Sequence, residues 1–174
     1  MLVLLHFYTL GYDAFQIALL FLLYEVAGVV TNLIGGWIGT RLGLKVTLFV
    51  GLGLQVIALS ALANFNPSWL VWQAVAFVMG LQALSGIAKD LTKMSSKSAV
   101  KLVVAEDAHD ALYKWVAILT GSKNALKGVG FFLGGALLTW IGYKTALSSM
   151  ADIVALALIV VSVLLTGDLG KAKE

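Results

Sequence analysis

The chain has 174 residues, of which 60% are hydrophobic and 12% are charged, with one proline and no cysteine. The mean hydropathy is +0.96, and the hydrophobic fraction exceeds the roughly 45–50% that is usual in soluble domains. This composition excludes a disordered chain or a disulfide scaffold and disfavours a soluble enzyme. The net charge of +3 is small and scattered, which disfavours nucleic-acid binding. The remaining class is an integral membrane protein.

Apolar runs of the length that crosses a bilayer, about 20 residues, recur along the chain. The segment 1–10 is apolar but too short, and it lacks the basic start and cleavage site of a signal peptide. We therefore expect it to be the outer end of a first helix whose beginning is missing from this chain. Five complete spans are predicted at about 14–40, 46–64, 68–88, 115–141 and 145–166. The predicted fold is all-α, a polytopic transmembrane helix bundle over residues 1–167.

Basic residues predict the orientation of these spans. If the spans alternate, nine of the 12 lysines and arginines fall on one side of the membrane, and the opposite loops hold only Lys144. Such a bias marks the cytoplasmic side. We therefore expect a cytoplasmic basic helix or loop at 89–114 and a cytoplasmic tail at 168–174. The nine residues are Arg41, Lys45, Lys89, Lys93, Lys97, Lys101, Lys114, Lys171 and Lys173.

The turn after the span 14–40 carries a recognisable pattern. It resembles the signature between the second and third helices of the major facilitator superfamily, with matches at Gly36, Arg41, Gly43 and Lys45. Thr40 stands where that signature has an aspartate. The glycines would permit a tight turn, and the arginine would hold a neighbouring helix end as part of an inner gate. The alternative is an ordinary positive-inside stop signal.

Two lysines lie inside the span 115–141, where charge is costly. Lys123 and Lys127 are four residues apart and so share a helix face. A charge at that depth costs about 2.5–3.5 kcal/mol on insertion scales unless it faces a cavity or a partner. We interpret the pair as an anion-binding site, with structural pairing as the alternative. Hydrogen bonds to a phosphate or carboxylate would come from Thr120, Ser122 and Asn124.

Two acids also fall within predicted spans. Glu25 and Asp152 are candidates for carrying a coupling proton, because burial and a nearby lysine shift a carboxyl pKa in opposite directions. The alternative is that either acid neutralises Lys123 or Lys127. Glu25 is the better candidate because it lies deeper.

The lysines at 89, 93, 97 and 101 recur every four residues and form a basic stripe. This stripe could draw an anionic substrate to the inner mouth, but a solvated face or an anchor to anionic lipid headgroups is the more common explanation. No spacing suggests a metal site, and no nucleophile–base arrangement or phosphate-cradling loop supports an enzyme. We expect no cofactor.

Two longer stretches carry a narrower resemblance, at 85–104 (SGIAKDLTKMSSKSAVKLVV) and 113–135 (YKWVAILTGSKNALKGVGFFLGG). Both are similar to the ArsJ family of organoarsenical efflux permeases, within the major facilitator superfamily. The resemblance covers essentially the whole chain and corresponds to the N-terminal six-helix half of such a permease, with helix one truncated.

The resemblance implies a multi-pass protein of the bacterial inner membrane that exports 1-arseno-3-phosphoglycerate and thereby confers arsenate resistance. It also implies a functional link to a glyceraldehyde-3-phosphate dehydrogenase, which makes that ester. We expect the export to be proton-coupled. Two alternatives remain: a facilitator for another organic phosphate or carboxylate, and a non-transporting membrane fragment that needs the missing C-terminal half.

Overall fold

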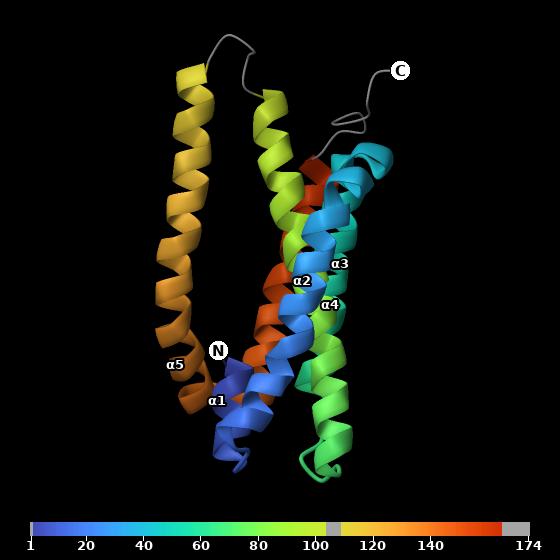
Figure 1. The fold of residues 1–174 in the computed structure, drawn as a ribbon. Coiled ribbons are helices and arrows are strands. Elements are labelled where there is room, and N and C mark those ends of the chain that lie inside the picture. The colour runs from blue at the N-terminus through green and yellow to red at the C-terminus, as the bar shows by residue number, and fades with distance from the viewer. Residues whose placement is uncertain (1, 104–108, 165–174) are drawn as a thin grey trace.

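The computed structural model describes residues 2–103 and 109–164. Within these helices, the side chains at 35, 36, 38–40, 42, 97–103, 109–112, 119, 123 and 124 are outside the described set. The described residues are helical throughout apart from short turns, and they contain no strand. The helices are α1 (Leu2–Thr9), α2 (Ala14–Leu42), α3 (Leu44–Ala63), α4 (Val71–Val103) and α5 (His109–Leu164) (Figure 1).

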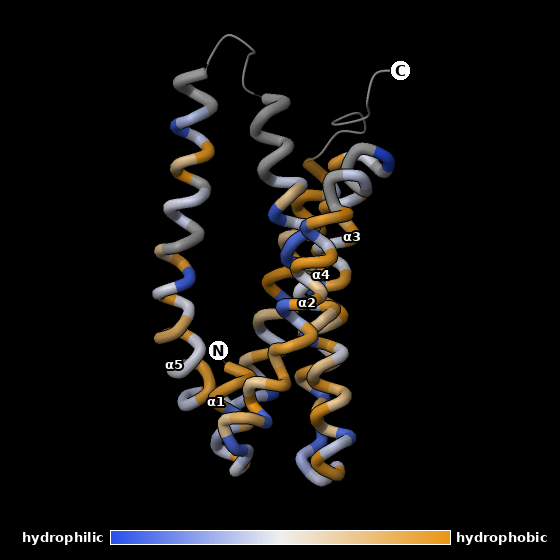
Figure 2. Tube along the Cα trace, in the orientation of Figure 1, coloured by the Kyte–Doolittle hydropathy of each residue, from blue (hydrophilic) through white to orange (hydrophobic). Residues whose placement is uncertain are grey.

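Four of these helices are long and apolar enough to cross a membrane. Their candidate spans are Ala14–Ile34, Leu44–Ala63, Val71–Ser96 and Tyr113–Leu164. Apolar residues predominate over much of the described length of these helices (Figure 2). Large apolar side chains remain uncovered by protein, among them Phe132 at 82% and Trp140 at 81% exposure. Such an apolar surface matches hydrocarbon better than water, which confirms the predicted membrane helix bundle.

Helix α5 contains a sharp bend that separates two arms. At Gly142 the backbone leaves the helical conformation, with φ 76° and ψ 169°. The candidate span in α5 runs as one from Tyr113 to Leu164, and the bend at Gly142 lies between the arms 109–141 and 143–164. The division into five spans stays a prediction. The six-helix half stays a prediction.

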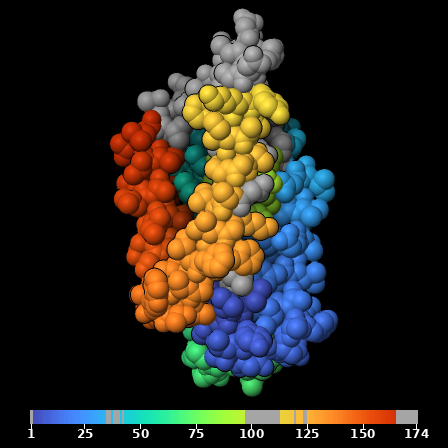
Figure 3. Space-filling view, turned by 90° about the vertical axis from the view of Figure 1, so that its left-hand side faces the viewer, coloured from blue at the N-terminus to red at the C-terminus, as the bar shows by residue number. Residues whose placement is uncertain are grey.

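Helix α4 is central to the packing. It lies against both α2 and α3, and α5 packs chiefly against α3. The first arm of α5 stands in front of this group, between the second arm and α2 (Figure 3). The short α1 lies beside the bend of α5 (Figure 1). One end of the space between the first arm and the other helices is therefore occupied by α1.

The buried core is aromatic where α1 meets the other helices. The imidazole of His6 stacks on the ring of Tyr143 at 3.9 Å between centroids. Phe7 is fully buried and lies 4.9 Å from the ring of Phe65 in the turn after α3. These contacts tie α1, the α3–α4 turn and the α5 bend together, because aromatic pairs at such distances add attraction beyond area burial.

Glycines allow α4 to approach its neighbours closely. A Cβ placed on Gly86 would lie 2.6 Å from the backbone oxygen of Tyr24 in α2. A Cβ on Gly51 of α3 would lie 3.0 Å from the backbone oxygen of Ala88. Small residues at such positions let helix backbones pack by direct van der Waals contact, which drives association where no hydrophobic effect operates.

Two bends depend on glycine backbone geometry. Gly43 separates α2 from α3 with φ 79° and ψ 158°, which is nearly the conformation of Gly142. This region of backbone space is essentially restricted to glycine. Thr47 completes the first bend by donating its hydroxyl to the carbonyl oxygen of Gly43 at 2.7 Å. The loop-motif glycine at 43 therefore sets the turn, as the sequence predicted.

We expect Gly142→Ala to destabilise the bundle by about 1–3 kcal/mol, because alanine is strained in this conformation. The apparent melting temperature of the protein in detergent micelles should fall by roughly 2–12 °C. Gly128→Ala is the matched control, since Gly128 is helical and a Cβ there meets nothing within 4 Å. That variant should melt at or slightly above the wild-type temperature. Equal melting temperatures for the two variants would contradict the role of the bend.

Candidate functional site

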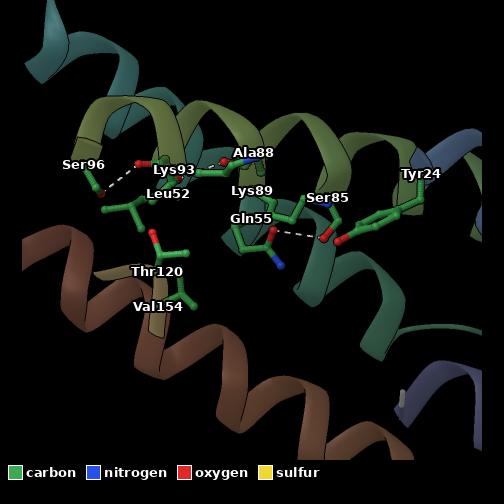
Figure 4. Close-up of a pocket in the computed structure, with 11 residues that line it drawn as sticks. Tyr24, Leu52, Gln55, Ser85, Ala88, Lys89, Lys93, Ser96, Thr120 and Val154 are labelled. Carbon is green, nitrogen blue, oxygen red and sulfur yellow. Dashed lines mark hydrogen bonds between the residues drawn. The ribbon is translucent and has the colours of Figure 1, made fainter. Parts of the chain in front are cut away.

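A cavity of about 510 Å³ lies between α4 and the helices around it. Residues of α2, α3, α4 and both arms of α5 line it (Figure 4). In Figure 4 the α4 residues form one wall, and Thr120 and Val154 of α5 lie across the opening. A second cavity of about 550 Å³ shares Tyr24, Gln55 and Ser85 with it. Each cavity falls in the range of ligand pockets, about 300–1,000 Å³.

Two lysines of α4 line the first cavity, Lys89 and Lys93. The ammonium of Lys89 lies over the ring of Tyr24, 4.2 Å from the centroid. This cation–π contact stabilises a charge that is partly removed from water. Glu25 of α2 also acts on Lys89 electrostatically. The cavity therefore presents two ammonium groups one helical turn apart.

Lys93 forms an ion pair with Asp90, whose Oδ1 lies 3.4 Å from the lysine nitrogen. The Asp90 side chain is only 2% exposed, whereas that of Lys93 is 31% exposed. On the side of α2, a Cβ on Gly28 would lie 2.8 Å from Asp90 Oδ2, so glycine makes room for the carboxylate. Among the described side chains this is the one ion pair.

Neutral polar groups complete the cavity wall. The hydroxyl of Ser85 donates to Gln55 Oε1 of α3 at 3.0 Å (Figure 4). Thr92 and Ser96 also line the cavity and donate back to carbonyl oxygens of their own helix. Two ammonium groups on a mostly apolar wall suit a small organic anion.

The predicted anion-site residues lie on the first arm of α5. Thr120 lines the cavity. Lys127 follows seven residues later, on nearly the same face of the helix, and its side chain is exposed. The hydroxyl of Ser122 donates to the carbonyl oxygen of Ile118 at 2.7 Å. The side chains of Lys123 and Asn124 lie outside the described residues. The structure thus brings Thr120 to the cavity and leaves the lysine pair of this arm as a prediction.

The two predicted proton carriers are not buried. Glu25 and Asp152 both have exposed side chains. Neither acid forms an ion pair with a described lysine. The buried carboxylate of the described helices is instead Asp90, which the sequence analysis placed in a basic cytoplasmic segment.

The loop motif forms the connection between α2 and α3. The guanidinium of Arg41 lies 4.9 Å from the Trp37 ring, and the ammonium of Lys45 lies 5.8 Å from the Phe49 ring. Gly36 belongs to α2, and its surroundings lie outside the described set. The gate role of this loop stays a prediction.

Sequence reasoning missed that Lys89 and Lys93 line the cavity and that Asp90 is buried beside them. It ended the span at Ala88, whereas the candidate span continues to Ser96 and α4 to Val103. The sequence did contain a signal that this part of the helix is packed against others. Ser85 and Gly86 directly precede the charged residues, and such small residues permit close packing of helices. The helix tolerates the three charges because they neutralise one another or lie on an aromatic ring.

The described residues contain no group of three or more side chains that could hold a metal ion. The fold is that of a multi-pass helical membrane protein with a cavity between its helices that two lysines line in part. The family model of the Major Facilitator Superfamily matches residues 1–174. The chain therefore belongs to this superfamily, whose members are transporters rather than enzymes. The comparisons with curated proteins and with solved structures find no match.

We expect the cavity to be open to water. The natural sequence has no cysteine, so Ser85→Cys and Ser96→Cys each introduce a single thiol into the cavity wall. A membrane-impermeant maleimide should label both at least about tenfold faster than Ser162→Cys, because thiolate forms readily only in contact with water. Ser162 is exposed on the second arm of α5 and does not line the cavity. Equally slow labelling at all three positions would exclude an aqueous cavity.

Proposed function

We propose that this protein transports a small organic anion through the space between α4 and the first arm of α5. The observation that carries the proposal is the pair of ammonium groups, Lys89 and Lys93, on the wall of one cavity within a membrane-spanning helix. Lys89 and Lys93 lie seven and three residues before the end of the candidate span at Ser96. Charge within a span is costly, so it is retained where it binds ligand or ions. In this superfamily the substrate would lie near the midplane, and rocking of helix groups would expose it to alternate sides.

The substrate we propose is a phosphorylated organoarsenical, 1-arseno-3-phosphoglycerate, exported to give arsenate resistance. The resemblance of the stretches 85–104 and 113–135 to ArsJ-type permeases supports this choice. The cavity lies beside both stretches, since Lys89, Lys93 and Thr120 belong to them and line it. A polyanionic ester suits a site with more than one ammonium group.

The same resemblance supports a place in the bacterial inner membrane with the C-terminal tail in the cytoplasm. It also supports a functional link to a glyceraldehyde-3-phosphate dehydrogenase. Arg41, Gly43 and Lys45 would form the inner gate. Lys123 and Lys127 would add positive charge from the arm that supplies Thr120, because Lys127 follows Thr120 by seven residues and thus falls on nearly the same face.

The function is tested by arsenate resistance. Arsenate-sensitive bacteria that express this gene together with a glyceraldehyde-3-phosphate dehydrogenase should grow at higher arsenate concentrations and release arsenate to the medium. Bacteria with the dehydrogenase alone, or with the membrane protein alone, should not. Unchanged resistance, with the protein present in the membrane, would contradict the arsenical substrate.

The anion site is tested by binding. The purified chain should bind 3-phosphoglycerate, a stable relative of the proposed ester, measured by calorimetry in detergent micelles. Lys93→Met and Lys127→Met should each weaken binding about 10- to 100-fold, the loss expected for one charge-assisted contact. Lys144→Met is the control, since Lys144 is exposed next to the α5 bend and outside the cavity. A deficit confined to Lys93→Met would assign the site to α4 alone.

A facilitator for another organic phosphate or a carboxylate is the second candidate. It is favoured by the cavity itself, because two ammonium groups can bind any small anion of suitable size. Uptake of a phosphate ester without a gain in arsenate tolerance would support it. Binding without any transport by the chain would support the remaining alternative, a membrane unit that needs a partner half.

A further inference from the structure

The second cavity, of about 550 Å³, is the feature that the proposed function leaves unused. Residues of all five helices line it, and most of them are aliphatic or aromatic. None of the described residues that line it is charged. Its wall is therefore an apolar surface with a few hydrogen-bonding groups, which is usual for sites that bind organic molecules. These polar groups belong to Tyr24, Gln55, Gln82 and Ser85.

Gln82 of α4 is buried at this cavity without a hydrogen-bond partner. It is 6% exposed and lines the cavity. Among the described residues, no group donates to its carboxamide or accepts from it. The polar side-chain atom that is fully sealed without a partner, in the described part of the chain, is instead the hydroxyl of Tyr143. The carboxamide of Gln82 therefore still borders the cavity. A buried amide without a partner costs free energy, so a ligand group that completes its hydrogen bonds is stabilised there.

The two cavities adjoin along three residues, Tyr24, Gln55 and Ser85, which line both of them. In Figure 4 these three lie at the end of the first cavity that is away from Ser96. The hydroxyl of Ser85 donates to Gln55 Oε1 at 3.0 Å, so this junction is polar but uncharged. The lining of the lysine cavity thus continues directly into that of the apolar cavity.

The spacing along α4 gives the length of a ligand that would occupy both cavities. Gln82 and Lys89 are seven residues apart, which places them on nearly the same face and about 10 Å apart along the helix axis. An extended chain of single bonds advances about 1.2 Å per bond, so a chain of about eight carbons spans this distance. A three-carbon ester held by the lysines is too short to reach Gln82.

We propose that the second cavity is a binding subsite for the uncharged body of a longer organic anion, whose charged end lies at Lys89 and Lys93 and whose far end hydrogen-bonds to Gln82. The inference rests on the proposed anion site and adds a second class of ligand to it. This ligand has one charged end, an apolar chain of about eight carbons and a hydroxyl or amide group at the other end. A charge at the far end is disfavoured, because no described charged group lines that cavity to compensate it.

The experiment compares two carboxylates that differ in one hydroxyl group. Octanoate and 8-hydroxyoctanoate share the charged end and the carbon chain, but only the second can form a hydrogen bond to Gln82. Their binding to the purified chain is measured by calorimetry in detergent micelles, with protein-free micelles subtracted. The wild type should bind 8-hydroxyoctanoate about 2- to 10-fold more tightly, the gain expected from one neutral hydrogen bond. 3-Phosphoglycerate should compete with both carboxylates, because all three need the lysines.

Substitutions of Gln82 should remove this preference. Gln82→Leu, and Gln82→Met with its longer unbranched side chain, should bind octanoate at least as tightly as 8-hydroxyoctanoate and should bind 3-phosphoglycerate as the wild type does. Gln73→Leu is the matched control, since Gln73 is exposed on the same helix and lines neither cavity. It should keep the preference for the hydroxyl. Each preference is a ratio within one variant, so it does not depend on how stable that variant is.

Equal binding of the two carboxylates by the wild type, or an unchanged preference in both Gln82 variants, would overturn the inference. Simultaneous binding of 8-hydroxyoctanoate and 3-phosphoglycerate would also overturn it, because the two ligands would then not share the lysines. Normal binding of 3-phosphoglycerate in these cases would leave the proposed function in place. Failure of the wild type to bind any of the three anions would overturn the proposed function as well.

Discussion

The close approach of α4 to α2 and α3 is the constraint on which the rest of the structure depends. Gly86 brings α4 within van der Waals contact of the Tyr24 carbonyl, and Gly51 does the same toward the backbone of Ala88. At these separations a methyl group has no room, so the register of the three helices is fixed. That register places the Tyr24 ring under Lys89 and puts Gly28 opposite Asp90. The cavity with its two lysines is a consequence of this packing.

The charges of α4 connect packing to chemistry. A span of hydrocarbon depth normally excludes lysine and aspartate, yet α4 holds two lysines and one aspartate within five residues. Each is compensated locally, by the Tyr24 ring or by the Asp90–Lys93 pair. This compensation needs no partner from outside, but it leaves the ammonium groups on the cavity wall. The charges of α4 are thus compensated within the described helices.

Several elements could be predicted from sequence because their causes are local. The glycine at 43 set the turn after the first long span, since its backbone conformation is almost restricted to glycine. The predicted break between the spans 115–141 and 145–166 likewise falls at a glycine, Gly142, with a similar backbone conformation. The burial of the candidate proton carriers could not be predicted in this way. Glu25 and Asp152 were chosen by position along the chain, yet their side chains are exposed, whereas Asp90 is buried. Burial of one acid depends on which neighbour supplies a glycine, and no local pattern reveals that.

By itself, the sequence determined the class of protein, the helical state of each apolar run and the positions of the bends. These follow from the bilayer's demand that each backbone satisfy its own hydrogen bonds and from the backbone freedom of single glycines. Only the tertiary structure decided which polar residues meet. From the sequence, Lys89 and Lys93 were interpreted as part of a solvated stripe, because a single helix does not show which of its faces other helices cover. The packing of α2, α3 and α5 around α4 places a cavity and the Tyr24 ring beside these lysines and buries the carboxylate of Asp90.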